Sequence, residues 1–225
     1  MAIKSNRVMI ILTSFICLLP IIFSFIVYSD LPEQIVVQWD NIGNPTNYIS
    51  KAYAAFGLPL FFLAVNIFSK LRLYNDPKRS NTSKVMQIFS TWTPPFLSLI
   101  IVPTTLYIAM GANIPIPMIV RILIGIILIL GGNYLPKSRQ NYTIGIKNPW
   151  TLSSSDNWNK THRLAGYLWI LGGIILTVSA FIATHNTFWS NSMPTLIIAL
   201  LIIIPFLYSY FIYKRTSDNK QDDNY

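Results

Sequence analysis

Six apolar runs constrain this chain more than any other feature, because each is long enough to cross the hydrocarbon layer of a membrane, which takes about 20 residues of helix. A helix is the expected form, since lipid offers no partner to an unpaired backbone amide and the runs lack the alternation of barrel strands. The sequence therefore predicts an all-α polytopic membrane protein with six transmembrane helices. The runs cover residues 8–28, 52–69, 85–110, 118–135, 164–184 and 194–213.

Composition and the placement of charge agree with this prediction. Of 225 residues, 52% are hydrophobic and 11% are charged, whereas soluble domains carry roughly 25% charged residues. With six spans and a cytoplasmic N-terminus, every Lys and Arg except Lys51 and Arg121 falls in a cytoplasmic segment, as the positive-inside rule requires. We therefore expect both termini in the cytoplasm, the lipid bilayer as a partner, and no direct binding of nucleic acid. Arg121 is expected to snorkel outward to the membrane surface.

The outer loop, residues 29–51, alternates Ile35, Val37 and Trp39 at period two before a turn at residues 40–45. This pattern predicts a short strand followed by a turn. Two interpretations of the loop stay open: a solvated connector with aromatic anchors at the membrane surface, or a specific recognition surface. The candidate recognition residues are Pro32, Gln38, Trp39, Gly43, Tyr48 and Lys51.

The long inner loop before the fifth run, residues 133–163, combines turn-forming, aromatic and basic residues. Gly145 and Asn148-Pro149 predict a compact turn over residues 143–152, and Ser155 or Asp156 is expected to cap the fifth helix. By contrast, the inner loop at residues 70–84 is interpreted as a flexible connector that only sets orientation.

Helical spacing places Trp158, His162 and Trp169 on one stripe of the fifth helix. The functional interpretation is a polar and aromatic groove that holds a peptide, a lipid headgroup or a cytoplasmic protein; the alternative is an interfacial girdle of anchoring aromatics. A lone His162 is more typical of a hydrogen-bonded structural residue than of a metal ligand. The candidate partner-binding residues are Asn133, Gly145, Lys147, Pro149, Trp150, Thr151, Trp158, His162 and Arg163.

Catalytic signatures are missing from the sequence. It contains no zinc-protease motif, no nucleophile elbow and no phosphate loop, and no acidic residue lies inside a predicted span. We expect no enzyme activity, no cofactor and no metal. The glycine pairs 131–132 and 172–173 predict a close approach of the fourth and fifth helices.

Two patterns resemble a known family. The run Asn133-Tyr134-Leu135-Pro136, the stretch Gly145 to Leu152, and the segment Trp158 to Gly166 are similar to the signature of the SdpI immunity protein family, with Lys147 at a position that usually holds Arg. The outer loop resembles the amino-terminal module common in that family, through Leu31, Pro32, Ile35, Trp39, Gly43, Pro45, Tyr48 and Lys51. Val36 and Gln38 depart from its usual Pro and His.

The resemblance implies a multi-pass protein of the bacterial cytoplasmic membrane that protects its producer from a secreted toxic peptide. In the best-known members the protein also signals, by holding a cytoplasmic repressor at the membrane. A toxic peptide and a cytoplasmic repressor are therefore the expected partners. The alternative function is a small transporter or lipid-handling membrane protein.

We divide the sequence into four segments. Residues 1–70 hold two transmembrane helices and the outer-loop module, and residues 71–117 hold the basic inner loop and a third helix that its prolines are expected to kink. Residues 118–213 form the SdpI-like transmembrane region, and residues 214–225 form a polar cytoplasmic tail that is expected to be disordered.

Overall fold

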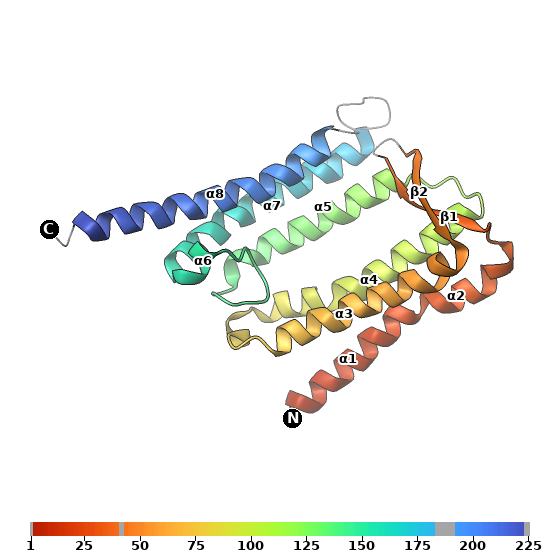
Figure 1. The fold of residues 1–225 in the computed structure, drawn as a ribbon, viewed down its shortest axis with the longest axis horizontal. Coiled ribbons are helices and arrows are strands. Elements are labelled where there is room, and N and C mark those ends of the chain that lie inside the picture. Colours follow the sequence, from red (N-terminus) through yellow and green to blue (C-terminus); the bar gives the residue numbers. More distant parts are fainter. Residues whose placement is uncertain (1, 41–42, 183–191, 223–225) are drawn as a thin grey trace. The chain divides into compact units, whose positions relative to one another are not determined.

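The fold is helical throughout, apart from one small hairpin (Figure 1). The structure, a computed structural model, describes residues 2–40, 43–182 and 192–222. Its main elements are α1 (Ala2–Leu18), α2 (Pro20–Val27), β1 (Gln34–Trp39), β2 (Pro45–Ser50), α3 (Leu58–Tyr74), α4 (Lys84–Ala109), α5 (Ile116–Tyr134), α6 (Pro149–Ser153), α7 (Ser155–Ile182) and α8 (Met193–Asp222). Single-turn elements are η1 (Tyr28–Asp30), η2 (Tyr53–Gly57), η3 (Arg79–Asn81) and η4 (Leu135–Lys137).

Six helical segments within the described residues are long and apolar enough to cross a membrane. The predicted all-α polytopic fold with six transmembrane helices is therefore confirmed. The cytoplasmic placement of the two termini stays a prediction. Residues 185–193, which join the fifth and sixth predicted runs, lie almost entirely outside the described residues.

Local helix geometry differs from the sequence prediction at several points. The first predicted run is two helices, because Pro20 has no N–H and its ring blocks the regular helical bond at the break after Leu18. Helix α4, by contrast, continues through Pro94, Pro95 and Pro103. The expected disorder of the tail is wrong up to Asp222, since α8 extends to that residue.

The chain forms two compact units. Unit 1 comprises Met1–Tyr74 and Ile88–Pro117, and unit 2 comprises Asn75–Gln87 and Met118–Tyr225. The second unit thus combines the first inner loop with the last three spans. This grouping places all three stretches that resemble the family signature inside a single unit.

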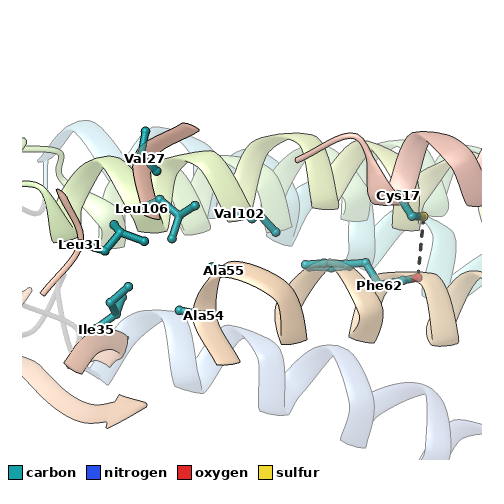
Figure 2. Packing of buried hydrophobic residues seen from close by; sticks show 9 residues of the cluster. All are labelled: Cys17, Val27, Leu31, Ile35, Ala54, Ala55, Phe62, Val102 and Leu106. Carbon is teal, nitrogen blue, oxygen red and sulfur yellow. Dashed lines mark hydrogen bonds between the residues drawn. The ribbon is translucent and has the colours of Figure 1, made fainter. Parts of the chain in front are cut away.

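The core of unit 1 is built from apolar side chains of α1, α2, η2, α3, α4 and the hairpin with the segment that leads into it (Figure 2). Buried polar groups are paired there: the Ser24 hydroxyl donates to the Ala55 carbonyl at 2.7 Å, and the Ser98 hydroxyl donates to the Cys17 carbonyl at 2.8 Å. The buried apolar residues are Cys17, Val27, Leu31, Ile35, Ala54, Ala55, Phe62, Val102 and Leu106.

The predicted strand at residues 35–39 is confirmed as β1, and it pairs antiparallel with β2. Ile35 is 1% exposed and lies opposite Ile49, so this pair faces the core, while Tyr48 lies opposite Val36 on the other face. The second strand was not predicted, because no residue of β2 is buried and its sequence shows no alternation. The centre of the predicted turn, residues 41–42, lies outside the described residues.

The predicted close approach of the fourth and fifth spans is confirmed in unit 2, where α5 and α7 meet through glycines. A Cβ added to Gly132 would lie 2.8 Å from the Gly166 carbonyl oxygen, and one added to Gly125 would lie 2.7 Å from that of Gly173. Gly172 instead faces Leu201 of α8. Backbones this close leave no room for any side chain.

Candidate functional site

The signature loop, defined here as residues 135–154 between α5 and α7, contains a helix that was not predicted. Asn148 caps α6: its side chain accepts from the Thr151 N–H at 2.8 Å, and the Thr151 hydroxyl accepts from the Asn148 N–H at 3.1 Å. Pro149 occupies the first helical position, where its missing N–H costs nothing. The predicted turn over residues 143–152 therefore ends in a capped single-turn helix.

Gly145 lies directly over two stacked rings of α7. The Trp158 and His162 rings are 3.9 Å apart at 19°, and Gly145 has φ +126°, a conformation that favours glycine. A Cβ at Gly145 would lie 2.4 Å from His162 Nε2. Backbone conformation and available space therefore both require glycine here.

His162 is hydrogen-bonded at both ring nitrogens. The Ile146 N–H donates to Nε2 at 3.0 Å, and Nδ1 lies 2.8 Å from the Trp158 carbonyl oxygen. Because a backbone N–H only donates and a carbonyl only accepts, Nε2 is the acceptor and Nδ1 carries the proton. His162 therefore holds the loop against α7 as a neutral ring.

Trp158 is fully buried, and its indole N–H donates to the Ser138 carbonyl at 2.8 Å. His162 is also fully buried. The stripe expected to line an open groove therefore faces the interior of unit 2. Both rings form the surface of α7 on which the loop packs. Buried aromatic side chains of this size contribute strongly to the stability of a core.

Gln140 joins three parts of unit 2. Its amide N–H groups donate to the Thr151 and Leu152 carbonyls at 2.9 and 2.7 Å. Its side-chain oxygen accepts from Lys78 Nζ at 2.8 Å, and its backbone carbonyl accepts from the Asn81 amide at 2.8 Å. Gln140 was not among the predicted residues, since a glutamine in a polar loop carries no distinguishing sequence signal.

The interpretation of residues 70–84 as a flexible connector is wrong for Asp76, which is 7% exposed and anchors the signature loop. Its carboxylate accepts from the Thr143 hydroxyl at 2.6 Å, the Tyr142 N–H at 2.9 Å and the Lys78 N–H at 2.8 Å. Burial acts to raise the pKa of Asp76, but these hydrogen bonds outweigh it and hold the pKa below its ordinary value.

A second set of bonds ties the loop to α8. The Asn148 amide donates to the Ser209 hydroxyl at 2.7 Å, and the Asn157 amide donates to the Ser209 carbonyl at 2.8 Å. Trp150 packs its ring against Phe206, with centroids 5.0 Å apart. The expected cap at Ser155 or Asp156 is one residue off: the Ser154 hydroxyl accepts from the Asn157 N–H at 3.3 Å.

The remaining candidate residues of this region lie on the surface. Lys147 is exposed, and its ammonium group donates to the Tyr142 and Thr143 carbonyls at 3.2 and 2.9 Å. Pro149, Arg163 and Asn133 are exposed as well. Among the nine candidates, Thr151, Trp158 and His162 are buried and Gly145 and Trp150 are half-buried, whereas Asn133, Lys147, Pro149 and Arg163 are exposed.

The hairpin arranges its candidates differently. Pro32, Gln38 and Tyr48 are exposed, and Trp39 and Gly43 are half-buried. Lys51 is half-buried as well and closes the open end of the hairpin: its Nζ lies 2.8 Å from Glu33 Oε1, and its N–H donates to the Glu33 carbonyl at 3.0 Å. The hydrogen bond to Glu33 raises the pKa of Lys51.

Within the described residues, no group of three or more His, Cys, Asp or Glu side chains comes together. Hydrogen bonds hold the signature loop in a fixed shape, and the hairpin leaves Gln38 and Tyr48 exposed.

The six apolar helices define a multi-pass protein of the cell membrane. Residues 137–210 match the model of the SdpI/YfhL protein family, and residues 15–63 match a domain of unknown function, DUF1648. By these matches the chain is similar to the SdpI/YfhL protein family over residues 137–210. It is 28% identical over 218 residues to the Immunity protein SdpI of Bacillus subtilis (strain 168), covering 96% of this chain and 100% of that protein. No solved structure matches the chain.

Proposed function

We propose that this chain is a membrane immunity protein that protects its cell from a secreted toxic peptide. The observation that carries the proposal is its similarity along nearly the whole length of the Bacillus subtilis Immunity protein SdpI. Both ends of the relative are covered, so the comparison includes the hairpin and the signature loop together. The absence of nucleophile and base motifs in the sequence supports a binding role over a catalytic one.

In this proposal the hairpin contacts the toxic peptide on the outer side of the membrane. The exposed Gln38 and Tyr48 offer an amide and a phenol ring for that contact. Tyrosine is well suited to recognition, because it provides a large contact area and a polar tip at small entropic cost. Lys51 serves instead to close the hairpin.

We further propose that the signature loop and the start of α7 lie in the cytoplasm and present Lys147 and Pro149 of the loop, with Arg163 of α7, to a cytoplasmic repressor. These residues are exposed, whereas the loop beneath them is internally hydrogen-bonded. A preformed loop loses little conformational entropy when a partner binds, which favours recognition. Toxin protection and repressor recruitment would then depend on different residues.

The proposal can be tested by complementation. The chain is expressed in Bacillus subtilis that lacks its own Immunity protein SdpI, and the cells are grown beside cells that still produce the corresponding toxin. Survival at the level of the unmodified strain is the expected result. In a second arm, the gene for this chain is deleted from its native host, and the deletion strain is exposed to culture supernatant of the unmodified host. If cells that contain the chain in their membrane are killed as readily as cells that lack it, in both arms, the immunity function is refuted.

The two proposed contacts can be separated by substitution. Tyr48→Ala is expected to reduce survival, while Lys147→Ala with Arg163→Ala is expected to leave survival intact and weaken recovery of a repressor with the membrane fraction. Loss of survival from the Lys147 and Arg163 variant alone would contradict this division.

A further inference from the structure

Lys70 is the most deeply buried cation of the described part of unit 1. It was predicted to begin an inner loop, yet it lies within α3 and is 3% exposed. Its ammonium group donates to the Met9 carbonyl at 2.9 Å and to the Thr13 hydroxyl of α1. The lysine therefore sits in the seam between α1 and α3.

Within residues 2–40, 43–182 and 192–222, no ion pair joins Lys70 to a carboxylate. Glu33 pairs with Lys51 and Asp156 pairs with Lys160. An ammonium group has three N–H donors, and the two oxygens it contacts are both uncharged. An intramembrane charge without a counter-ion is costly, and such residues usually mark sites where an ion or ligand binds.

Asn66, one turn earlier on α3, carries a hydrogen-bond acceptor that lacks a donor. It is fully buried, and its amide nitrogen lies 3.2 Å from the hydroxyls of Thr13 and Ser14. Its side-chain oxygen is buried without a hydrogen-bond partner. A buried acceptor of this kind favours any ligand that brings a donor.

The seam continues as ordinary packing further along both helices, where the Cys17 thiol donates to the Phe62 carbonyl at 3.8 Å (Figure 2). The Lys70 ammonium group and the Asn66 side-chain oxygen lie toward the other end of the seam, near the start of α1 and the end of α3. Lys70 lies four residues before Tyr74, the last residue of its span, which is about 6 Å along the helix. Met9 is the second residue of the first span. This depth corresponds to the boundary between acyl chains and headgroups.

The flanks of the site are apolar and open. Val8 and Leu12 on α1, and Ile67 and Leu71 on α3, are exposed large hydrophobic side chains. Met9, whose carbonyl accepts from Lys70, is 37% exposed, so the exposed surface begins next to the buried ammonium group. Phosphate esters are the anions found at this depth of a bilayer, and lysine binds phosphate as a point charge.

We propose that Lys70 and Asn66 form a binding site for a phosphate ester that also carries a hydrogen-bond donor. The phosphate oxygens would accept hydrogen bonds from the Lys70 ammonium group and balance its charge. A hydroxyl or amino group of the same molecule would donate to the Asn66 oxygen. A phospholipid headgroup such as phosphatidylglycerol and soluble glycerol phosphate share this chemistry. The site is independent of the proposed immunity function, and its three polar residues, Thr13, Asn66 and Lys70, lie outside both family matches.

The test uses the full chain purified in detergent, with native mass spectrometry of bound lipid. Phosphatidylglycerol is expected to remain bound to the unmodified chain at higher collision energy than phosphatidylcholine, whose headgroup has no donor. Lys70→Met keeps the length of the side chain and is expected to lower the retained phosphatidylglycerol about tenfold, as loss of a charged contact does. Asn66→Leu is expected to remove the preference over phosphatidylcholine.

Arg72→Met is the matched control, because Arg72 is an exposed cation two residues away on the same helix. It is expected to retain phosphatidylglycerol at the unmodified level. Equal loss from Lys70→Met and Arg72→Met, or no loss from Lys70→Met, would overturn the site. Competition by glycerol phosphate at millimolar concentration, with no lipid retained, would overturn the lipid as the source. Asn66→Leu provides the second reading if Lys70→Met fails to fold.

Discussion

The hairpin and the signature loop were both candidate recognition surfaces, and they use their motif residues in opposite ways. The hairpin leaves Gln38 and Tyr48 exposed and buries mainly Ile35. The signature loop buries its own Thr151, packs over the buried Trp158 and His162 of α7, and leaves Lys147 exposed. Residues that look like ligand-binding groups can therefore be the internal frame of a loop.

This difference separates stability from recognition. A substitution inside the signature loop removes internal hydrogen bonds and is expected to lower the free energy of unfolding. A substitution on the exposed face of the hairpin removes no internal contact and is expected to change recognition alone.

The largest effect is expected at Gly145. Gly145→Ala adds a Cβ against the His162 ring at a backbone conformation that alanine avoids, so the free energy of unfolding should fall by about 4 kcal/mol. Gly111→Ala is the control, because Gly111 has φ +94° with no atom within 4 Å of the added Cβ. It should cost about 1 kcal/mol. Equal losses in chemical denaturation in micelles would show that the packing over the rings is not needed.

A smaller loss is expected from Trp158→Phe. The variant keeps a ring but leaves the Ser138 carbonyl buried without its donor, which should cost about 2 to 3 kcal/mol. Trp150→Phe serves for comparison, since Trp150 contributes ring contacts with Phe206 and Tyr210, and should cost about 1 kcal/mol. If the Trp150 variant is the less stable one, the loop is held by α8 rather than by the indole bond.

The third prediction concerns pH. The pKa of Asp76 is lowered in the folded chain, so the unfolded chain binds the proton more tightly. The stabilisation is therefore complete above the ordinary aspartate pKa of about 4 and is lost as the pH falls through the lower folded value. Asp76→Asn should remove the loss of stability that the unmodified chain shows below about pH 4, and should lower the free energy of unfolding at pH 7 by about 1 to 2 kcal/mol.

Asp156→Asn is the matched control for Asp76, because Asp156 is an exposed carboxylate paired with Lys160. It should change the free energy of unfolding by no more than about 0.5 kcal/mol. A pH profile that Asp76→Asn leaves unchanged would mean that this carboxylate does not anchor the loop.

The smallest change in stability is expected on the hairpin. Tyr48→Ala and Gln38→Ala should stay within about 0.5 kcal/mol of the unmodified chain, while survival in the complementation assay falls. Lys51→Met should lower the free energy of unfolding only slightly, since it removes a surface ion pair with Glu33. A Tyr48 variant that protects as well as the unmodified chain would remove the hairpin from the recognition surface.

The sequence was sufficient to predict the six spans, the first strand and the glycine contact between α5 and α7. These features follow from apolar length, period-two alternation and small residues, which act locally or along one helix. The cap of α6 was also within reach, because Asn148 stands directly before Pro149. It was missed because a helix of one turn leaves no periodicity.

The internal partners of the signature loop could not be predicted. Asp76 contacts Tyr142 and Thr143 from 66 and 67 residues away, and Asn148 contacts Ser209 from 61 residues away. No pattern within one segment indicates such a pair, since a polar residue in a polar loop is ordinary. Lys70 was predicted to lie in an inner loop, because a lysine near the end of a span usually snorkels to the surface. Its partners Met9 and Thr13 lie in another helix and leave no signal in the sequence around Lys70.

Hydrogen exchange at the Ile146 amide tests the central claim most directly, because this N–H donates to His162 only if the signature loop is folded against α7. In the full chain in micelles, we expect the Ile146 amide to exchange at least about a hundredfold more slowly than an unstructured peptide, and His162→Ala to abolish that protection. Exchange of Ile146 at the unprotected rate in the unmodified chain would contradict the account.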